Sequence, residues 1–254
     1  MFNKIYSRLI RLDKLKIKKS KGLKKVFYFL ILKFINLIRW IYCIFINPKE
    51  INLDDFFNKI KIFWYGGNEG HTQQVVEETM YLAQVSTKAK NILEIGFNGG
   101  HSAETMLQSS DKSYVLSVDI GFHHYVKFGY YFLKKKYRNR VKLVIGDSKK
   151  VLPQLVGSNK KFDLIFIDGG HDYDIVKSDL NNAIKMSDKN TLIIVDDVYY
   201  PVSEKTKEYF DDHNNGPTKA WLELIKEEKI TEVEYVQFVT NNTNLRSLVA
   251  GKLK

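Results

Sequence analysis

Acidic side chains and one histidine follow two short apolar runs of the sequence. Asp168 ends the run FDLIFID, and His171 follows three residues later. Asp196 and Asp197 end the run TLIIVDD. Carboxylates that lie close together raise one another's pKa unless a cation neutralises them, and such oxygen ligands suit Mg²⁺ or Ca²⁺. The pattern therefore predicts a divalent-cation site at Asp168, Asp196 and Asp197 beside His171, with helix capping by the acidic pair and a structural histidine as the alternative.

A glycine-rich turn with an acidic residue comes earlier, in the segment LEIGFNGGHSA. Gly96 and Gly100 allow the backbone to approach a ligand, and Ser102 can cap the following helix. Glu94 lies inside the apolar run, where a carboxylate needs a donor such as the ammonium group of an amino-acid ligand. The spacing G-x-x-G-G differs from the G-x-G-x-x-G of dinucleotide-binding folds, which argues against an NAD dehydrogenase.

Two further carboxylates end the next two apolar runs. Asp119 comes 119 − 96 = 23 residues after Gly96, where it can accept hydrogen bonds from both hydroxyls of a ribose. Asp147 is suited to the edge of an adenine ring. Either residue alone would more often cap a loop or a helix, but the ordered series with Glu94 favours a ligand that contains a nucleoside.

Five runs rich in β-branched residues position these side chains, and they alternate with segments of helical spacing. The runs are too apolar for half-exposed strands and too short for helices, so we expect strands buried on both faces of a parallel sheet. The alternation predicts a doubly wound α/β fold, with ligands at the carboxyl ends of the strands. The predicted strands are 91–96, 114–120, 141–148, 162–170 and 191–198, followed by 233–239 and 245–251; the predicted helices are 72–84, 101–109, 126–137, 175–186 and 218–228, with a turn at 64–67 and a loop at 211–215.

The first glycine-rich motif resembles that of class I S-adenosylmethionine-dependent methyltransferases, which has the form E-x-G-x-x-x-G-x-S. The resemblance covers about residues 89–254. It implies a Rossmann-like, seven-stranded, mostly parallel sheet with an antiparallel last strand, and S-adenosyl-L-methionine as the cofactor. The residues that it implies for cofactor binding are Glu94, Gly96, Gly100, Ser102, Asp119 and Asp147.

The sequence D-G-x-H at Asp168, with its acidic pair downstream, is similar to the metal-dependent sugar O-methyltransferases that modify macrolide glycosides, the macrocin type. This resemblance implies that Asp168, Asp196 and Asp197 bind Mg²⁺ and that His171 is the general base. An alcohol is a poor nucleophile until its proton is removed, and an imidazole can accept that proton.

We therefore expect an O-methyltransferase that acts on a sugar or polyol hydroxyl of a small-molecule or glycan acceptor, such as a membrane-bound glycan precursor. Two alternatives remain open at this point. One is a methyltransferase for a small catechol-like phenol. The other is a non-catalytic, nucleotide-binding interaction module.

The net charge of +11 belongs to one end of the chain. Residues 1–49 contain thirteen Lys and Arg against one acid, Asp13, which leaves 40 − 13 = 27 basic and 29 − 1 = 28 acidic residues for the remainder. The nearly neutral remainder argues against nucleic-acid binding. The single cysteine, Cys43, cannot form an internal disulfide, so a reducing, cytoplasmic location is expected.

The apolar run 26–46 follows the Lys-rich stretch and would be about 31 Å long as a helix. A helix lying in the membrane interface fits its polar sector, and the basic stretch suits an anionic leaflet. We predict peripheral membrane contact through residues 1–46, at the inner face of a membrane. The alternative is a helix docked on its own domain or on a second subunit of a homo-oligomer. The polar sector of this predicted helix contains Lys25, Lys33, Asn36 and Arg39. The chain is thus divided into a basic and apolar segment (1–49), a helical lead-in (50–88) and the catalytic domain (89–254).

Overall fold

The computed structural model describes residues 21–60, 76–200, 212–239 and 245–254. The turn predicted at 64–67 and the start of the helix predicted at 72–84 lie outside these residues. Seven strands form one sheet in the order β3-β2-β1-β4-β5-β7-β6. The strands are β1 (Asn91–Ile95), β2 (Tyr114–Asp119), β3 (Val141–Ile145), β4 (Leu164–Ile167), β5 (Leu192–Asp196), β6 (Ile230–Val239) and β7 (Leu245–Leu253).

The sheet is mostly parallel, as predicted, because β7 alone runs against its two neighbours, β5 and β6. The chain builds β1, β2 and β3 toward one edge and then returns to β4 beside β1. Ligands of doubly wound folds bind where the strand order reverses, at the carboxyl ends of the strands. In this chain that position is the crevice between β1 and β4.

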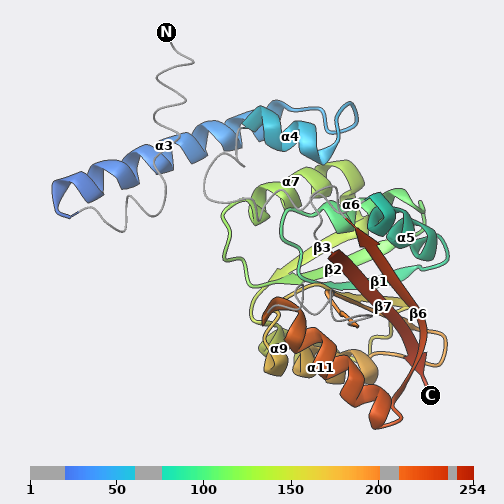
Figure 1. Ribbon diagram of the computed structural model, residues 1–254. Helices are drawn as coiled ribbons and strands as arrows, with labels where there is room; N and C mark the ends of the chain where they lie inside the picture. The colour runs from blue at the N-terminus through green and yellow to red at the C-terminus, as the bar shows by residue number, and fades with distance from the viewer. Residues whose placement is uncertain (1–20, 61–75, 201–211, 240–244) are drawn as a thin grey trace.

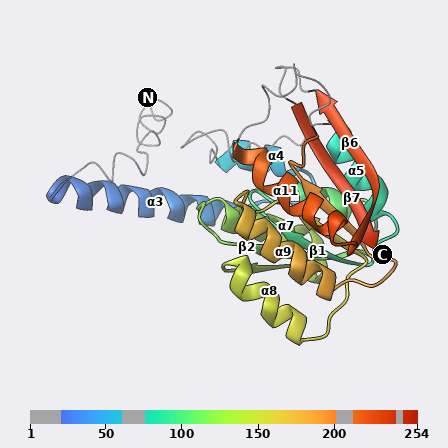
Figure 2. The same cartoon turned by 60° about the horizontal axis from the view of Figure 1, so that its bottom comes forward.

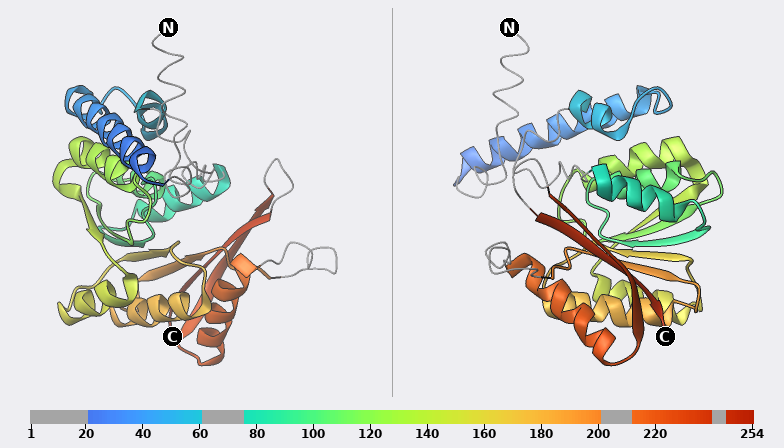
Figure 3. Two further views of the ribbon diagram at one scale, coloured as in Figure 1. Left: turned by 90° about the vertical axis from the view of Figure 1, so that its left-hand side faces the viewer. Right: turned by 45° about the vertical axis from the view of Figure 1, so that its right-hand side comes forward.

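Helices cover both faces of the sheet, as Figures 1 and 3 show. One core contains Phe56, Met106 and Phe132, from the helices on the α7 side, and the other contains Leu180 and Trp221 from the opposite side, which Figure 2 brings forward. The helices are α3 (Leu23–Phe45), α4 (Leu53–Ile60), α5 (Val76–Ser86), α6 (His101–Gln108), α7 (Val126–Tyr137), α8 (Ser148–Gly157), α9 (Tyr173–Lys185) and α11 (Asp212–Lys226).

Three expectations from the sequence are wrong in detail. Strand β3 is not buried on both faces, because it lies at the edge of the sheet; only Val141 in it is buried. Helix α8 was not predicted, and it contains Pro153. Helix α11 begins at Asp212, so the segment before Pro217 that was expected to be a loop is helical.

Helix α3 packs its C-terminal half on α7 and projects away from the sheet at its N-terminal end (Figure 1). Arg39 is only 2% exposed, and its Nε donates to the carbonyl oxygen of Ile60 at 3.2 Å. Trp40 packs on the ring of Phe128, with centroids 4.7 Å apart. The predicted polar sector is therefore not all directed toward lipid headgroups or water. The guanidinium of Arg39 faces protein because a main-chain carbonyl of the lead-in satisfies it there.

Candidate active site

The turn between β1 and α6 closes over the carboxyl end of β1. Gly96 and Gly100 have φ angles of 100° and 95°, a region that L side chains rarely adopt. Asp119, at the end of β2, holds this turn in place. Its Oδ2 accepts hydrogen bonds from the N–H groups of Phe97, at 3.0 Å, and Asn98, at 2.9 Å. The second oxygen of Asp119 accepts the N–H of Gly121 at 2.6 Å. The carboxylate thus organises the turn, and its contact with a ribose stays a prediction.

Glu94 is fully buried beneath the same turn. Its two oxygens accept the hydroxyl groups of Ser102, from α6, and Ser117, from β2. Burial raises the pKa of Glu94 to about 7, although the two serine hydrogen bonds oppose this rise. These bonds connect β1, β2 and α6, so the structure gives Glu94 a positioning role. Its contact with a ligand ammonium group stays a prediction.

Ser102 does not cap α6, which corrects the expectation from the sequence. The N-cap residue is Gly100, in the left-handed conformation and without a side-chain cap. Ser102 is the second residue of α6, where its hydroxyl donates a hydrogen bond to Glu94. Asp147 does cap a helix: it is the N-cap of α8, and its Oδ1 accepts the N–H of Lys149 at 3.0 Å. Its predicted contact with an adenine edge is untested.

The predicted acidic residues lie at the ends of two adjacent strands. Asp168 follows β4, Asp196 ends β5, and Asp197 follows it with a φ of 57°. Burial, and then the charges of neighbouring carboxylates, raise the pKa of Asp168 and of Asp196 well above the ordinary aspartate value. Oδ1 of Asp196 is buried and has no hydrogen-bond partner among the described residues. The structure therefore brings the three acids into one electrostatically coupled group.

His171 lies between β4 and α9, beside this group. Its Nδ1 is 3.4 Å from Oδ2 of Asp197, and about a quarter of the imidazole side chain (27%) is exposed. A cavity of about 10 Å³ separates the two strand ends, and Pro217 of α11 forms part of its wall. The remaining lining residues are Ile167, Asp168, Gly169, Gly170, His171, Val176, Val195 and Asp196.

Two charged residues of this site were not recognised from the sequence. Glu78, on α5, is buried, and its charge raises the pKa of both Asp168 and Asp196. Arg246, on β7, places Nη1 3.3 Å from Oδ1 of Asp197. Burial lowers the pKa of Arg246, but the surrounding carboxylates more than offset this and raise it overall. No local pattern marks either residue, because Glu78 reaches the site through the packing of α5 and Arg246 through the position of β7 beside β5.

The acidic group is not a preformed metal centre. Within the described ranges, no set of three or more His, Cys, Asp or Glu side chains is arranged to hold a metal ion. Asp197 instead pairs with the guanidinium of Arg246 and with His171.

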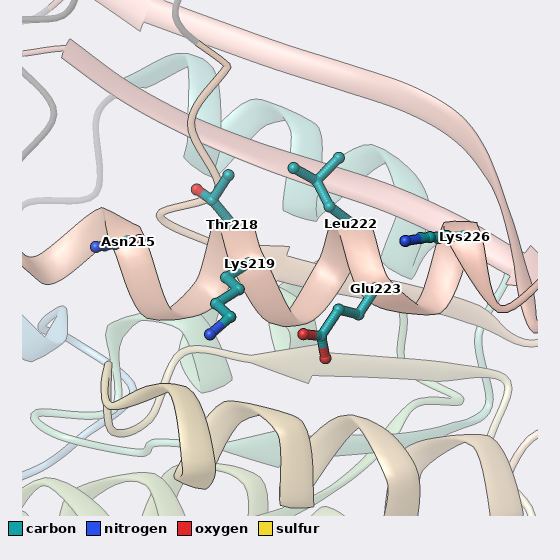
Figure 4. Close-up of a pocket in the computed structure, with 6 residues that line it drawn as sticks. All are labelled: Asn215, Thr218, Lys219, Leu222, Glu223 and Lys226. Atoms are coloured by element: carbon teal, nitrogen blue, oxygen red, sulfur yellow. The ribbon is translucent and has the colours of Figure 1, made fainter.

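A larger hollow of about 300 Å³ lies on the outer side of α11 and contains none of the strand-end residues (Figure 4). Its one carboxylate, Glu223, accepts hydrogen bonds from the Tyr173 hydroxyl at 2.5 Å and the Lys177 ammonium at 2.7 Å. This carboxylate is therefore already satisfied by α9, and we place the active site at the strand ends. The hollow is lined by Asn215, Thr218, Lys219, Leu222, Glu223 and Lys226.

Comparisons with known proteins relate part of the chain to a known family. Residues 93–198 match a family model described as a methyltransferase domain, a segment that runs from β1 to the end of β5. No curated protein sequence matches the chain. The match and the strand order together show a methyltransferase domain at residues 93–198, so the alternative of a non-catalytic module is set aside.

Solved structures share the fold. A candidate O-methyltransferase from Klebsiella pneumoniae is 25% identical, with a TM-score of 0.58, over 74% of this chain and 87% of that chain. The O-methyltransferase of Bacillus cereus, solved with S-adenosylhomocysteine, is 19% identical, with a TM-score of 0.62, over 82% of this chain and 90% of its own. The N-methyltransferase NodS of Bradyrhizobium japonicum is 17% identical, with a TM-score of 0.52, over 70% of this chain and 94% of its own.

Proposed function

We propose that this methyltransferase transfers the methyl group of S-adenosylmethionine to a hydroxyl oxygen of a sugar or polyol. His171 is the general base, and Asp168, Asp196 and Asp197 hold Mg²⁺. The observation that supports the proposal is the approach of His171 to Asp197, whose Oδ2 lies 3.4 Å from Nδ1 of the imidazole, beside the carboxylates of Asp168 and Asp196 at the ligand-binding end of the sheet.

The imidazole explains why a hydroxyl is the favoured acceptor. In the transfer, the acceptor oxygen forms a bond to the methyl carbon, the bond between that carbon and sulfur breaks, and the hydroxyl proton must leave. Nδ1 of His171 faces Asp197, so Nε2 is the nitrogen that we assign to receive the proton. The carboxylate of Asp197 then stabilises the imidazolium that forms, as carboxylates do beside catalytic histidines. The O-methyltransferases among the structural neighbours are consistent with this acceptor atom.

The carboxylate oxygens suit Mg²⁺ by chemical type, and holding the ion would require these side chains to move from their described positions, which are not preformed for a metal. Burial and the charges of neighbouring carboxylates raise the pKa of Asp168 and of Asp196, and the buried Oδ1 of Asp196 lacks a hydrogen bond within the described chain. Arg246 supplies one positive charge to Asp197 but leaves the unpaired oxygen of Asp196 unsatisfied. When bound, Mg²⁺ would lower the pKa of an acceptor hydroxyl and fix its direction. Asp168, Asp196 and Asp197 would be its protein ligands.

The cofactor side of the site rests on the turn after β1. Gly96 and Gly100 allow the tight, positive-φ backbone of this turn, and Asp119 accepts hydrogen bonds from its N–H groups. We propose that S-adenosylmethionine occupies this turn. Its remaining contacts would come from Glu94, Ser102 and Asp147.

A methyl-transfer assay with an analysed product tests the proposal. The full chain is incubated with S-adenosylmethionine labelled in its methyl group and with extracted cell-envelope glycans and glycolipids. An ether product resists mild base and releases an O-methyl sugar on acid hydrolysis, and we expect this product by mass spectrometry. The same mixture with His171→Ala should give no product. Label recovered only on phenols, amines or base-labile esters would contradict the sugar hydroxyl as the acceptor.

A further inference from the structure

Helix α3 exposes large apolar side chains around most of its circumference. In its projecting half, Phe27, Leu30 and Phe34 are 60%, 58% and 62% exposed along one side. Val26 and Phe29 are 55% and 49% exposed on another side. Within the described ranges, α3 is also the one helix long and apolar enough to cross a membrane, by length and composition.

We propose that α3 is a fixed arm whose projecting half lies in the interface of one leaflet of an anionic membrane, without crossing the bilayer, and that it holds the catalytic domain at the cytosolic surface. This inference concerns location alone and does not depend on which acceptor is methylated.

Two contacts fix the arm to the catalytic domain. At the C-terminal end of α3, the ammonium group of Lys135 donates to the carbonyl oxygens of Ile44 at 2.7 Å and Ile46 at 2.6 Å. A lysine in this position satisfies the orphan carbonyl groups of a helix end and complements its partial negative charge. One turn earlier, Arg39 is buried and bonded to Ile60. Detaching α3 would leave these groups without their protein partners.

The pattern of exposure favours lipid over a second copy of the chain. The exposed apolar side chains of the projecting half adjoin a polar sector that contains Lys25 and Lys33, which is the arrangement of a helix that lies at a membrane interface. Charge agrees with this choice, because residues 1–25 contain ten Lys and Arg and one Asp. Such a stretch beside an apolar helix is attracted to anionic headgroups. Lys33 is also exposed, with its ammonium nitrogen 4.8 Å from the centroid of the Phe29 ring, and its flexible stem is long enough for the ammonium to reach the headgroups.

The length of the projecting half excludes a complete span while α3 stays docked. Arg39 and Cys43 are buried against the domain and Ile35 is the first buried residue of α3, so residues 23–34 form its projecting half. Twelve helical residues extend about 18 Å, whereas the hydrocarbon core is about 30 Å thick. A complete span would also place the catalytic domain on the side opposite the basic stretch, away from cytosolic S-adenosylmethionine.

Vesicle flotation tests the arm. Full-length protein is mixed with vesicles of phosphatidylcholine, with or without 30% phosphatidylglycerol as roughly the anionic content of a charged leaflet. We expect flotation with the anionic vesicles and at least about a tenfold loss in the double variant Phe27→Ser/Phe34→Ser. The matched control is Leu222→Ser/Val233→Ser, which removes two exposed apolar side chains from other elements and should float like the original protein. Equal loss in both variants, or equal binding to neutral vesicles, would overturn the proposal.

Insertion and crossing are distinguished by labelling. The variant Lys21→Cys places a thiol at an exposed position before α3, while the natural thiol of Cys43 is buried. On sealed vesicles an impermeant maleimide should label Lys21→Cys at once, and protection until detergent is added would show a span and contradict the arm. If the protein does not bind vesicles but sedimentation velocity shows a dimer that the Phe27→Ser/Phe34→Ser variant does not form, the partner of α3 is a second copy of the chain and the lipid proposal is wrong. Binding of S-adenosylhomocysteine, measured by calorimetry, should be unchanged in every variant and verifies folding separately from the methyl-transfer assay.

Discussion

Gly96 lies so close to Asp168 that a Cβ atom on the glycine would be 1.8 Å from the main-chain oxygen of the aspartate. The contact joins the end of β1 to the end of β4, the two strands between which the strand order reverses. The N–H of Asp168 donates to the carbonyl oxygen of Ile95 at 2.8 Å, so both backbones are held. The glycine-rich turn and the acidic group are therefore parts of one site.

Replacing Gly96 with Ala should destabilise the protein severely, because both the φ of 100° and the contact with Asp168 exclude a side chain. We expect a loss of at least about 2 kcal/mol in the free energy of unfolding, measured by chemical denaturation. Gly157→Ala is the matched control: nothing lies within 4 Å of its added Cβ, and it ends α8. That change should be neutral or stabilising by up to about 1 kcal/mol. Equal stability of the two variants would contradict the close approach.

Asp119→Ala should weaken binding of S-adenosylhomocysteine by about 1.5–3 kcal/mol, the range for hydrogen bonds to a charged group. The loss includes the ligand contact and the alignment of Phe97 and Asn98, whose N–H groups Asp119 accepts. Calorimetry measures the dissociation constant. The control is Asp111→Ala, since that side chain is fully exposed and its ion pair with Arg140 is long, at 4.0 Å. An unchanged constant for Asp119→Ala would remove this carboxylate from cofactor binding.

Metal dependence is predicted from the coupled carboxylates. EDTA should abolish methyl transfer and Mg²⁺ should restore it, because the added charge neutralises Asp168, Asp196 and Asp197. Direct binding of Mn²⁺, followed by electron paramagnetic resonance, gives a second reading that needs no acceptor. The double variant Asp196→Asn/Asp197→Asn should bind no Mn²⁺. Full activity in EDTA together with no Mn²⁺ binding would mean that no metal ion is needed and that Arg246 alone offsets the negative charge of these carboxylates.

His171→Ala should lower kcat by about 10²–10⁴-fold and leave the affinity for S-adenosylmethionine nearly unchanged. The imidazole faces Asp197 and belongs to the acceptor side of the site. The activity of the original protein should fall at low pH as the base becomes protonated, and the variant should lose this dependence. Asp172→Ala, an exposed neighbour, is the control. A kcat that is unaffected in His171→Ala over the whole pH range would exclude His171 as the base.

Glu94 should make stability decrease with rising pH. Its folded pKa of about 7 lies above the ordinary glutamate value, so the folded state binds the proton more tightly than the unfolded state does. The contribution is complete below the unfolded pKa and is lost as the pH rises through about 7. Between pH 5 and 8 we expect a loss of roughly 1–3 kcal/mol that Glu94→Gln reduces. Denaturation at several pH values checks the slope; identical slopes in the two proteins would assign the effect to other groups.

Local patterns were sufficient for the strands and for several helices. The strand predicted at 91–96 is β1, Asn91–Ile95, and the helix predicted at 126–137 is α7, Val126–Tyr137. Both are marked by apolar spacing within one element, and the parallel arrangement follows from their alternation. The resemblance in the first motif added the antiparallel seventh strand. Helix α8 was not predicted because Pro153 interrupts its helical pattern and because the strand predicted at 141–148 included its first residue, Ser148.

The composition of the site was decided by the tertiary structure. Asp168, Asp196 and Asp197 were recognisable because each follows an apolar run, whereas Glu78 and Arg246 reach them only through helix packing and the insertion of β7 beside β5. The same is true of Arg39, whose direction along α3 depends on which carbonyl oxygen lies opposite. Periodicity reports which side of an element is apolar. It does not report which distant element covers that side, because the order of strands in a sheet is set by contacts between residues far apart in the chain.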